Sequence, residues 1–110
     1  MIDSTCVIVR RPPGEETSFL GIRTAYATLM SAIETKTLFM EDGIYNLLSD
    51  KGYHAEMLKE IIGAEGELYC VRESIETRGL SEEDLVKGVK MVSEEDVARL
   101  VDECEAVAVF

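Results

Sequence analysis

The sequence predicts an α/β fold in which about five mostly parallel strands form one sheet with helices on both faces. Short apolar runs of four or five residues alternate with longer amphipathic segments along the whole chain. The segments between these runs are too long for hairpin turns, so successive strands require crossover connections, which are right-handed in nearly all proteins. A length of 110 residues with 46% hydrophobic residues fits one domain spanning residues 1–110.

The N-terminal half begins with a buried strand. Residues 5–9 form the apolar run Thr-Cys-Val-Ile-Val, which ends at two arginines and two prolines. Apolar residues at spacings of three and four then predict an amphipathic helix over residues 16–34. The apolar run at residues 37–40 predicts the second strand, and the Glu-Asp-Gly sequence after it is typical of a turn. A helical turn at residues 44–48 and a helix at residues 54–62 follow.

The C-terminal half continues this alternation. Residues 73–79 read as a helix that ends at a glycine. Ser81 and Ser93 each precede an aspartate by three residues, which is the pattern of a helix N-cap, so each predicts a helix start. Three apolar segments predict the remaining strands, at residues 67–71, 89–92 and 106–110.

The apolar runs also predict the core and the state of assembly. A small sheet that exposes Tyr45 and Tyr69 would gain stability by burying apolar surface against another subunit, so we expect the protein not to be a monomer. The side chains that we expect to be buried in or against the sheet are Cys6, Ile8, Leu38, Val107 and Val109.

Charge and cysteine content restrict the function classes. The formal net charge of −11 repels phosphate backbones and anionic lipids, so we predict no direct nucleic-acid partner and no membrane partner. Cys6, Cys70 and Cys104 are odd in number and far apart, and no signal peptide precedes Asp3, which predicts a reducing, cytoplasmic location. His54, the single histidine, has no second ligand on its helix face, so we predict a solvated helix-start residue, no metal and no cofactor.

Four segments together resemble the DsrE/DsrF-like family, and within it the DsrF/TusC branch. They are Arg-Arg-Pro-Pro-Gly at residues 10–14, Phe-Met-Glu-Asp-Gly-Ile-Tyr at 39–45, Glu-Ser-Ile-Glu-Thr-Arg-Gly-Leu at 73–80, and the C-terminal segment that ends Val-Phe. The resemblance runs over nearly the whole chain and lies in the order and spacing of the segments. It implies a flavodoxin-like three-layer sandwich that assembles with itself or with paralogous DsrE/DsrH-like subunits. It also implies sulfur relay, in which persulfide sulfur passes between cysteines of donor and acceptor proteins toward tRNA thiolation or dissimilatory sulfur metabolism.

Cys70 is the predicted sulfur carrier, because relay needs a reachable thiolate. It ends a central strand just before a helix that starts near Ser74, where open α/β sheets bind ligands, and Arg72 and Arg78 add positive potential. The alternative is a small buried thiol that is inert. Catalytic members of the family place their cysteine one residue later, where this chain has Val71, and a one-residue offset turns a strand side chain to the opposite face.

Seven further residues are predicted to form a binding site around the strand ends. Arg10 and Arg11 follow the first strand and lie near the start of the first helix, where they would form a cationic loop. The alternative is that they are only solvated arginines at a strand exit. The turn after the second strand would shape a neighbouring loop or a subunit contact. Three functions stay open: a persulfide carrier, a non-catalytic subunit of a sulfurtransferase complex, and a small-anion binder at this loop edge. The seven residues are Arg10, Arg11, Gly14, Asp42, Gly43, Tyr45 and Ser74.

Overall fold

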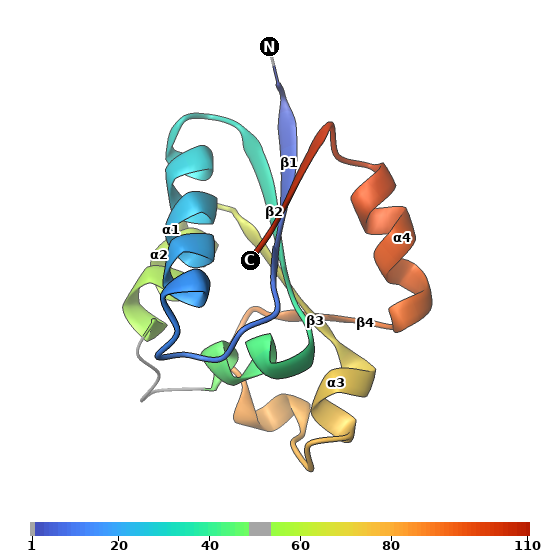
Figure 1. The fold of residues 1–110 in the computed structure, drawn as a ribbon. Helices are drawn as coiled ribbons and strands as arrows, with labels where there is room; N and C mark the ends of the chain where they lie inside the picture. Colours follow the sequence, from blue (N-terminus) through green and yellow to red (C-terminus); the bar gives the residue numbers. More distant parts are fainter. Residues whose placement is uncertain (1, 49–53) are drawn as a thin grey trace.

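The structure, a computed structural model, describes residues 2–48 and 54–110 and has one five-stranded parallel sheet between two helical layers (Figure 1). The strands lie in the order β4-β3-β2-β1-β5, and each neighbouring pair is parallel. The strands are β1 (Ser4–Val9), β2 (Glu34–Phe39), β3 (Glu67–Val71), β4 (Lys90–Val92) and β5 (Ala106–Val109). The helices are α1 (Glu16–Met30), the 3-10 helix η1 (Glu41–Leu47), α2 (Ala55–Gly63), α3 (Arg72–Glu76), the 3-10 turn η2 (Glu82–Asp84) and α4 (Glu94–Asp102).

Two apolar cores, one on each face of the sheet, confirm the predicted α/β sandwich. Because successive strand residues point to opposite faces, β1, β2 and β3 each supply side chains to both cores. The first core joins β1 to β3 with α1 and α2, and the second packs the same strands against α4 (Figure 1). Val7 and Cys70 belong to the first core, and Cys6, Val71 and Leu100 belong to the second.

The second strand begins earlier than predicted, which corrects the expected helix over residues 16–34. Helix α1 ends at Met30, and Ala32 takes a left-handed φ of 65° that turns the chain into β2. Thr35 and Lys36 look polar in the sequence yet are buried. The Thr35 hydroxyl bonds that of Thr28 at 2.9 Å, and the Lys36 ammonium pairs with the Glu103 carboxylate. Partners from other elements therefore allow polar residues to enter the sheet.

The two predicted helix caps differ in the structure. The backbone amide of Ser81 donates to the Asp84 carboxylate at 2.9 Å in a capping box, but the helix that follows is only the 3-10 turn η2. Ser93 does precede α4, although its hydroxyl lies 3.2 Å from the Asp96 carboxylate and caps no amide. Among the described residues, no helix is both long enough and apolar enough to cross a membrane.

The predicted core is confirmed for Cys6, Ile8 and Leu38 but is wrong for Val107 and Val109. These two valines are 44% and 57% exposed. They share the α4 face with their register partners in β1, but β5 is the edge strand of the sheet, and the buried residues of the second core come from β1, β2, β3 and α4. An apolar pattern predicted a strand correctly here, yet it carried no information on what covers that strand.

Two aromatic predictions also need correction. His54 is not a solvated residue: it is 5% exposed, its ring lies 5.9 Å from the Phe19 ring, and burial lowers its pKa. Tyr69 was expected on the surface but is 9% exposed, because it faces α4, and its hydroxyl donates to the Glu67 carboxylate at 2.8 Å. Tyr45 is half-buried against the first core.

Candidate functional site at the carboxyl edge of the sheet

A cleft of about 370 Å³ lies at the carboxyl ends of β1, β2 and β5. Along the chain the strands proceed from β1 to β4 in one direction, and β5 then returns to the other side of β1. The cleft therefore lies at the topological switch point, which is where open α/β sheets bind their ligands. Its lining residues are Arg10, Arg11, Thr17, Glu41, Asp42, Val109 and Phe110.

The exit of β2 is shaped by a backbone that packs directly on β1. Glu41 takes a left-handed φ of 52°, and the amide of Gly43 donates to the carbonyl of Met40 at 2.9 Å. A Cβ atom at Gly43 would lie 2.0 Å from the carbonyl oxygen of Val9. Only glycine permits this approach, so Gly43 holds η1 against the end of β1.

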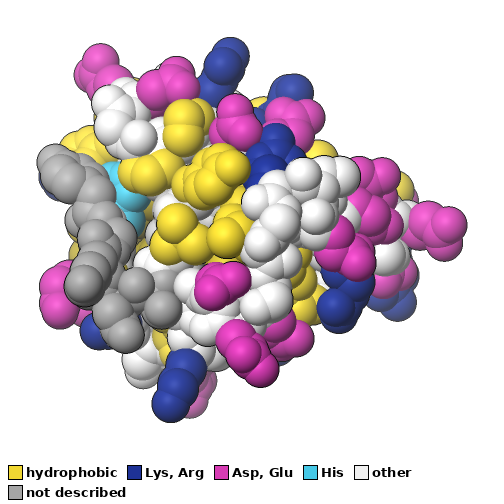
Figure 2. Space-filling model, turned by 90° about the horizontal axis from the view of Figure 1, so that it is seen from below, with side chains coloured by type: hydrophobic (Ala, Val, Ile, Leu, Met, Phe, Trp, Pro, Cys, Tyr) yellow, Lys and Arg dark blue, Asp and Glu magenta, His cyan; other side chains and the backbone are white. Residues whose placement is uncertain are grey.

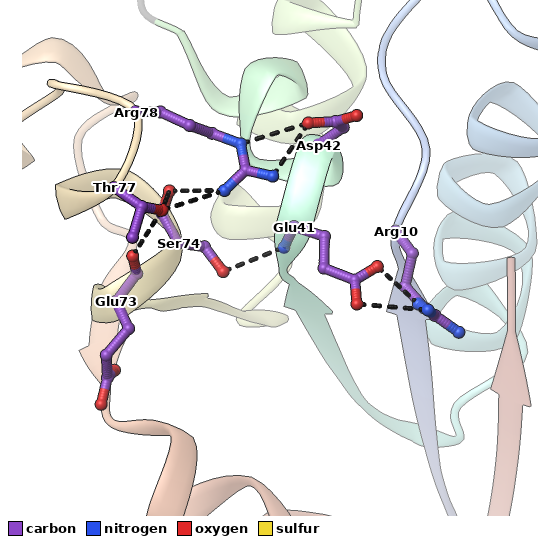
Figure 3. Close-up of polar contacts among 7 residues, drawn as sticks. All are labelled: Arg10, Glu41, Asp42, Glu73, Ser74, Thr77 and Arg78. Carbon is purple, nitrogen blue, oxygen red and sulfur yellow. Dashed lines mark hydrogen bonds and ion pairs between the residues drawn. The ribbon is translucent and has the colours of Figure 1, made fainter.

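Two arginine–carboxylate pairs cross the edge of the sheet (Figure 3). Arg10 donates from Nε and Nη2 to the two carboxylate oxygens of Glu41, at 2.9 and 3.2 Å, and this pairing raises the pKa of Arg10. Arg78 donates from Nη2 and Nε to one oxygen of Asp42, at 2.9 and 3.2 Å. Because both pairs are open to solvent on at least one side, they orient the side chains more than they stabilise the fold.

Ser74 joins the exit of β3 to the exit of β2. Its hydroxyl accepts a hydrogen bond from the backbone amide of Glu41 at 2.9 Å, and its carbonyl accepts one from Arg78 Nη1 at 3.0 Å (Figure 3). Ser74 is 7% exposed, so it acts beneath the surface of the site. The site is thus braced from three strand ends that neighbour one another in the sheet.

Asn46 fixes the loop that carries the two arginines. Its side-chain amide donates to the carbonyl of Arg11 and to the carbonyl of Gly43, each at 2.9 Å. Asn46 is 1% exposed, so both bonds form away from bulk water. Sequence reasoning missed this residue, and its position three residues after the glycine of the turn is the one signal that pointed to it.

Replacing Asn46 by alanine should lower the free energy of unfolding by about 2 kcal/mol, because two backbone carbonyls lose a buried donor. Urea unfolding followed by circular dichroism measures the change. Thr24→Ala is the matched control, since the Thr24 hydroxyl donates to the carbonyl of Leu20 within one turn of α1, in an exposed hydrogen bond. If both variants lost the same stability, Asn46 would not be the brace described above.

Cys70 does not reach this cleft. It is fully buried in the first core, and its Sγ lies 3.7 Å from the carbonyl oxygen of Val71. Burial raises the pKa of Cys70 to about 12, against a smaller opposing effect of Arg72. Val71, the alternative position, is also fully buried, on the other face. In the part of the chain that the structure describes, no three His, Cys, Asp or Glu side chains gather as a metal ion would require.

The structure brings together most of the predicted binding residues. Arg10, Arg11 and Asp42 line the cleft, and Gly43 and Ser74 support it from below. Gly14 and Tyr45 lie elsewhere: Gly14 has a left-handed φ of 98° and borders a separate cavity of about 230 Å³ next to Phe19 and His54. Glu41 was not predicted as a site residue, although its position directly before Asp42 at a strand exit was the available signal.

Comparison with known proteins agrees with this architecture. A model of the DsrE/DsrF-like family matches residues 3–110. An uncharacterized protein of Methanopyrus kandleri, MK0008, is 31% identical over 113 residues and covers 96% of this chain and 92% of its own. The uncharacterized protein MJ0989 of Methanocaldococcus jannaschii is 28% identical over 111 residues and covers 96% of this chain and 97% of its own.

Two solved structures share the fold. The ychN protein of Escherichia coli has a TM-score of 0.84 at 22% identity over 100% of both chains. MTH1491 of Methanobacterium thermoautotrophicum, a protein of unknown function, has a TM-score of 0.80 at 17% identity over 96% of this chain and 99% of its own.

Proposed function

The chain belongs to the DsrE/DsrF-like family, and on that premise we propose that it serves sulfur relay as a non-catalytic subunit. Its carboxyl-edge cleft would contact a partner protein, while a cysteine of that partner carries the persulfide. The observation that carries this proposal is the separation of thiols from the cleft: Cys70, the expected carrier, is fully buried, and none of the three cysteines, all of which the structure describes, lines the cleft.

The protonation of the thiols supports this role. Burial raises the pKa of Cys6 to about 11 and that of Cys70 to about 12. Persulfide transfer requires attack by a thiolate, and a thiol with a pKa near 12 has roughly one thiolate in 100,000 molecules at neutral pH. Cys104 is half-buried and burial is also the main cause of its raised pKa. None of the three therefore has the exposed, low-pKa environment of a reactive cysteine.

The geometry favours a protein-contact role for the cleft over the binding of a small anion. Arg10 is neutralised by Glu41, and Arg78 by Asp42. Among the described residues 2–48 and 54–110, Arg11 is the one arginine of the cleft that forms no ion pair. Figure 2, which views the molecule from the side of these strand ends, shows basic and acidic side chains interspersed around apolar ones, with no continuous basic area. Such a mixed surface matches the polar rim of a protein interface.

Exposure of the native chain to a persulfide donor should leave Cys70 without added sulfur. Mass spectrometry of peptides measures the increase of one sulfur atom at each cysteine, and brief alkylation with iodoacetamide should label Cys104 before Cys6 and Cys70. The Cys104→Ser variant should then show almost no native labelling, while the unfolded chain labels fully. When a paralogous DsrE/DsrH-like subunit is added, the sulfur should appear on that subunit's cysteine. Sulfur on Cys70 of the folded chain would contradict the proposed role.

A further inference from the structure

The two edges of the sheet differ in their protection. The β4 edge is three residues long and carries Lys90, whose ammonium lies 3.3 Å from the Glu67 carboxylate. The β5 edge has the sequence Ala-Val-Ala-Val, without charge or proline. Natural proteins guard exposed sheet edges with lysine, proline or short strands, because an unguarded edge pairs with another strand. The β5 edge, four residues long, carries neither lysine nor proline.

The backbone of β5, an edge strand, points hydrogen-bonding groups to its outer side. Phe110 directs both its amide and its carbonyl toward β1, since its amide donates to Ile8 at 2.7 Å and its carbonyl accepts from Arg10 at 2.8 Å. Successive strand residues point these groups to alternate sides, so those of Val107 and Val109 point away from β1. Figure 1 shows β5 in front of the rest of the sheet, with α1 and α4 to either side of it.

The side chains of β5 supply apolar contact area beside these groups. Val107 and Val109 are 44% and 57% exposed, and both lie on the α4 face, because they pair in register with Cys6 and Ile8. Exposed valines on an edge strand are the side chains that a pairing strand would bury.

Charge differs between the two ends of this strand. The exposed Glu105 directly precedes β5. At the carboxyl end of β5, Val109 and Phe110 line the cleft that also contains the exposed Arg11. Antiparallel pairing of two copies would bring Glu105 of each copy toward Arg11 of the other. Parallel pairing would instead place Glu105 beside Glu105 and could not close around a twofold axis.

We propose that two copies of this chain associate through antiparallel pairing of their β5 strands, with the twofold axis at Ala108. Val107 of one copy then faces Val109 of the other, so that each pair exchanges two backbone hydrogen bonds and one sheet runs through both copies. The interface shares Arg11 and Val109 with the cleft of the proposed function, but it uses no cysteine, so its test does not depend on sulfur transfer.

The Val109→Lys variant tests this interface, because it places a charge one residue from the twofold axis, at a site that is exposed in the single chain. Light scattering at micromolar concentration should give a mass half that of the wild-type assembly. Leu20→Lys is the matched control, since Leu20 is 47% exposed on α1, and its mass should remain that of the wild type. Val107→Pro should act like Val109→Lys, because it removes an outward-facing amide and leaves the ladder with β1 in place.

Two further experiments test the interface: a swap of the charges at Arg11 and Glu105, and a measurement of amide hydrogen exchange in β5. Arg11→Glu and Glu105→Arg should each weaken association, and the double variant should restore it. In the wild-type protein, the amides of Val107 and Val109 should exchange as slowly as those of Ala106 and Ala108, and Val109→Lys should make the Val107 amide exchange faster. A wild-type protein with the mass of a single copy, or a Val109→Lys variant with the wild-type mass, would overturn the proposal whatever the outcome of the sulfur experiments.

Discussion

Replacing Gly43 by alanine should lower the free energy of unfolding by about 3 kcal/mol, as expected for a small-to-large change in a closely packed site. The added Cβ would lie 2.0 Å from the carbonyl oxygen of Val9 and 2.7 Å from its carbon. These are backbone atoms of β1, so no side-chain rotation relieves the contact. To fit the methyl group, η1 must move away from β1, and the bond from the Met40 amide to the Val9 carbonyl, 3.2 Å in the structure, would break.

Urea unfolding of Gly43→Ala measures this loss, and Gly63→Ala provides the control. Gly63 is the last residue of α2, and nothing lies within 4 Å of a Cβ built there. Alanine should therefore leave stability unchanged or raise it by up to about 1 kcal/mol, because it reduces the freedom of the unfolded chain. Equal stability of the two variants would show that the close approach of η1 to β1 is absent in solution.

The fold followed from the sequence where burial alone decides the pattern. Buried parallel strands read as continuous apolar runs, so β1 and β3 lie within one residue of their predicted bounds. The first half of β2 could not be predicted, because Lys36 enters the sheet only through its pairing with Glu103, 67 residues later in the chain. The exposure of Val107 and Val109 was equally hidden, since a strand sequence does not say whether its position is central or at an edge.

The candidate site was partly predictable for a topological reason. Carboxyl ends of neighbouring parallel strands meet at one edge of a sheet, so Arg10, Asp42 and Ser74 had to lie near one another. The pairing of Arg10 with Glu41 could not be predicted, because it depends on the left-handed φ of 52° at Glu41. The environment of Cys70 was undecided for a similar reason: one residue of register determines which face of the sheet a strand side chain enters.

The burial of Cys6 and Cys70 should make the protein lose stability steeply above pH 9. In the folded chain the pKa of Cys6 is about 11 and that of Cys70 about 12, against an ordinary value of 9.0 that the unfolded chain regains. Above pH 9 the unfolded state releases protons that the folded state retains, so stability is complete below pH 9 and falls as pH rises. Each thiol approaches a slope of about 1.4 kcal/mol per pH unit once it is ionised in the unfolded chain, and because it is half ionised there at a pH of about 9, the two thiols together remove about 2 kcal/mol between pH of about 9 and about 10.

Urea unfolding at a series of pH values measures this slope, and Cys70→Ala separates the two thiols. The variant should lose about half of the slope between pH of about 9 and about 10, because only Cys6 then contributes fully to it. Val7→Ala is the control for a truncated core side chain: Val7 is fully buried in the same core as Cys70, so its loss should lower stability at every pH without changing the slope. If Cys70→Ala kept the wild-type slope, Cys70 would ionise in the folded protein as readily as in the unfolded chain. Such a thiol would be open to solvent and free to attack a persulfide, and the non-catalytic role would fail.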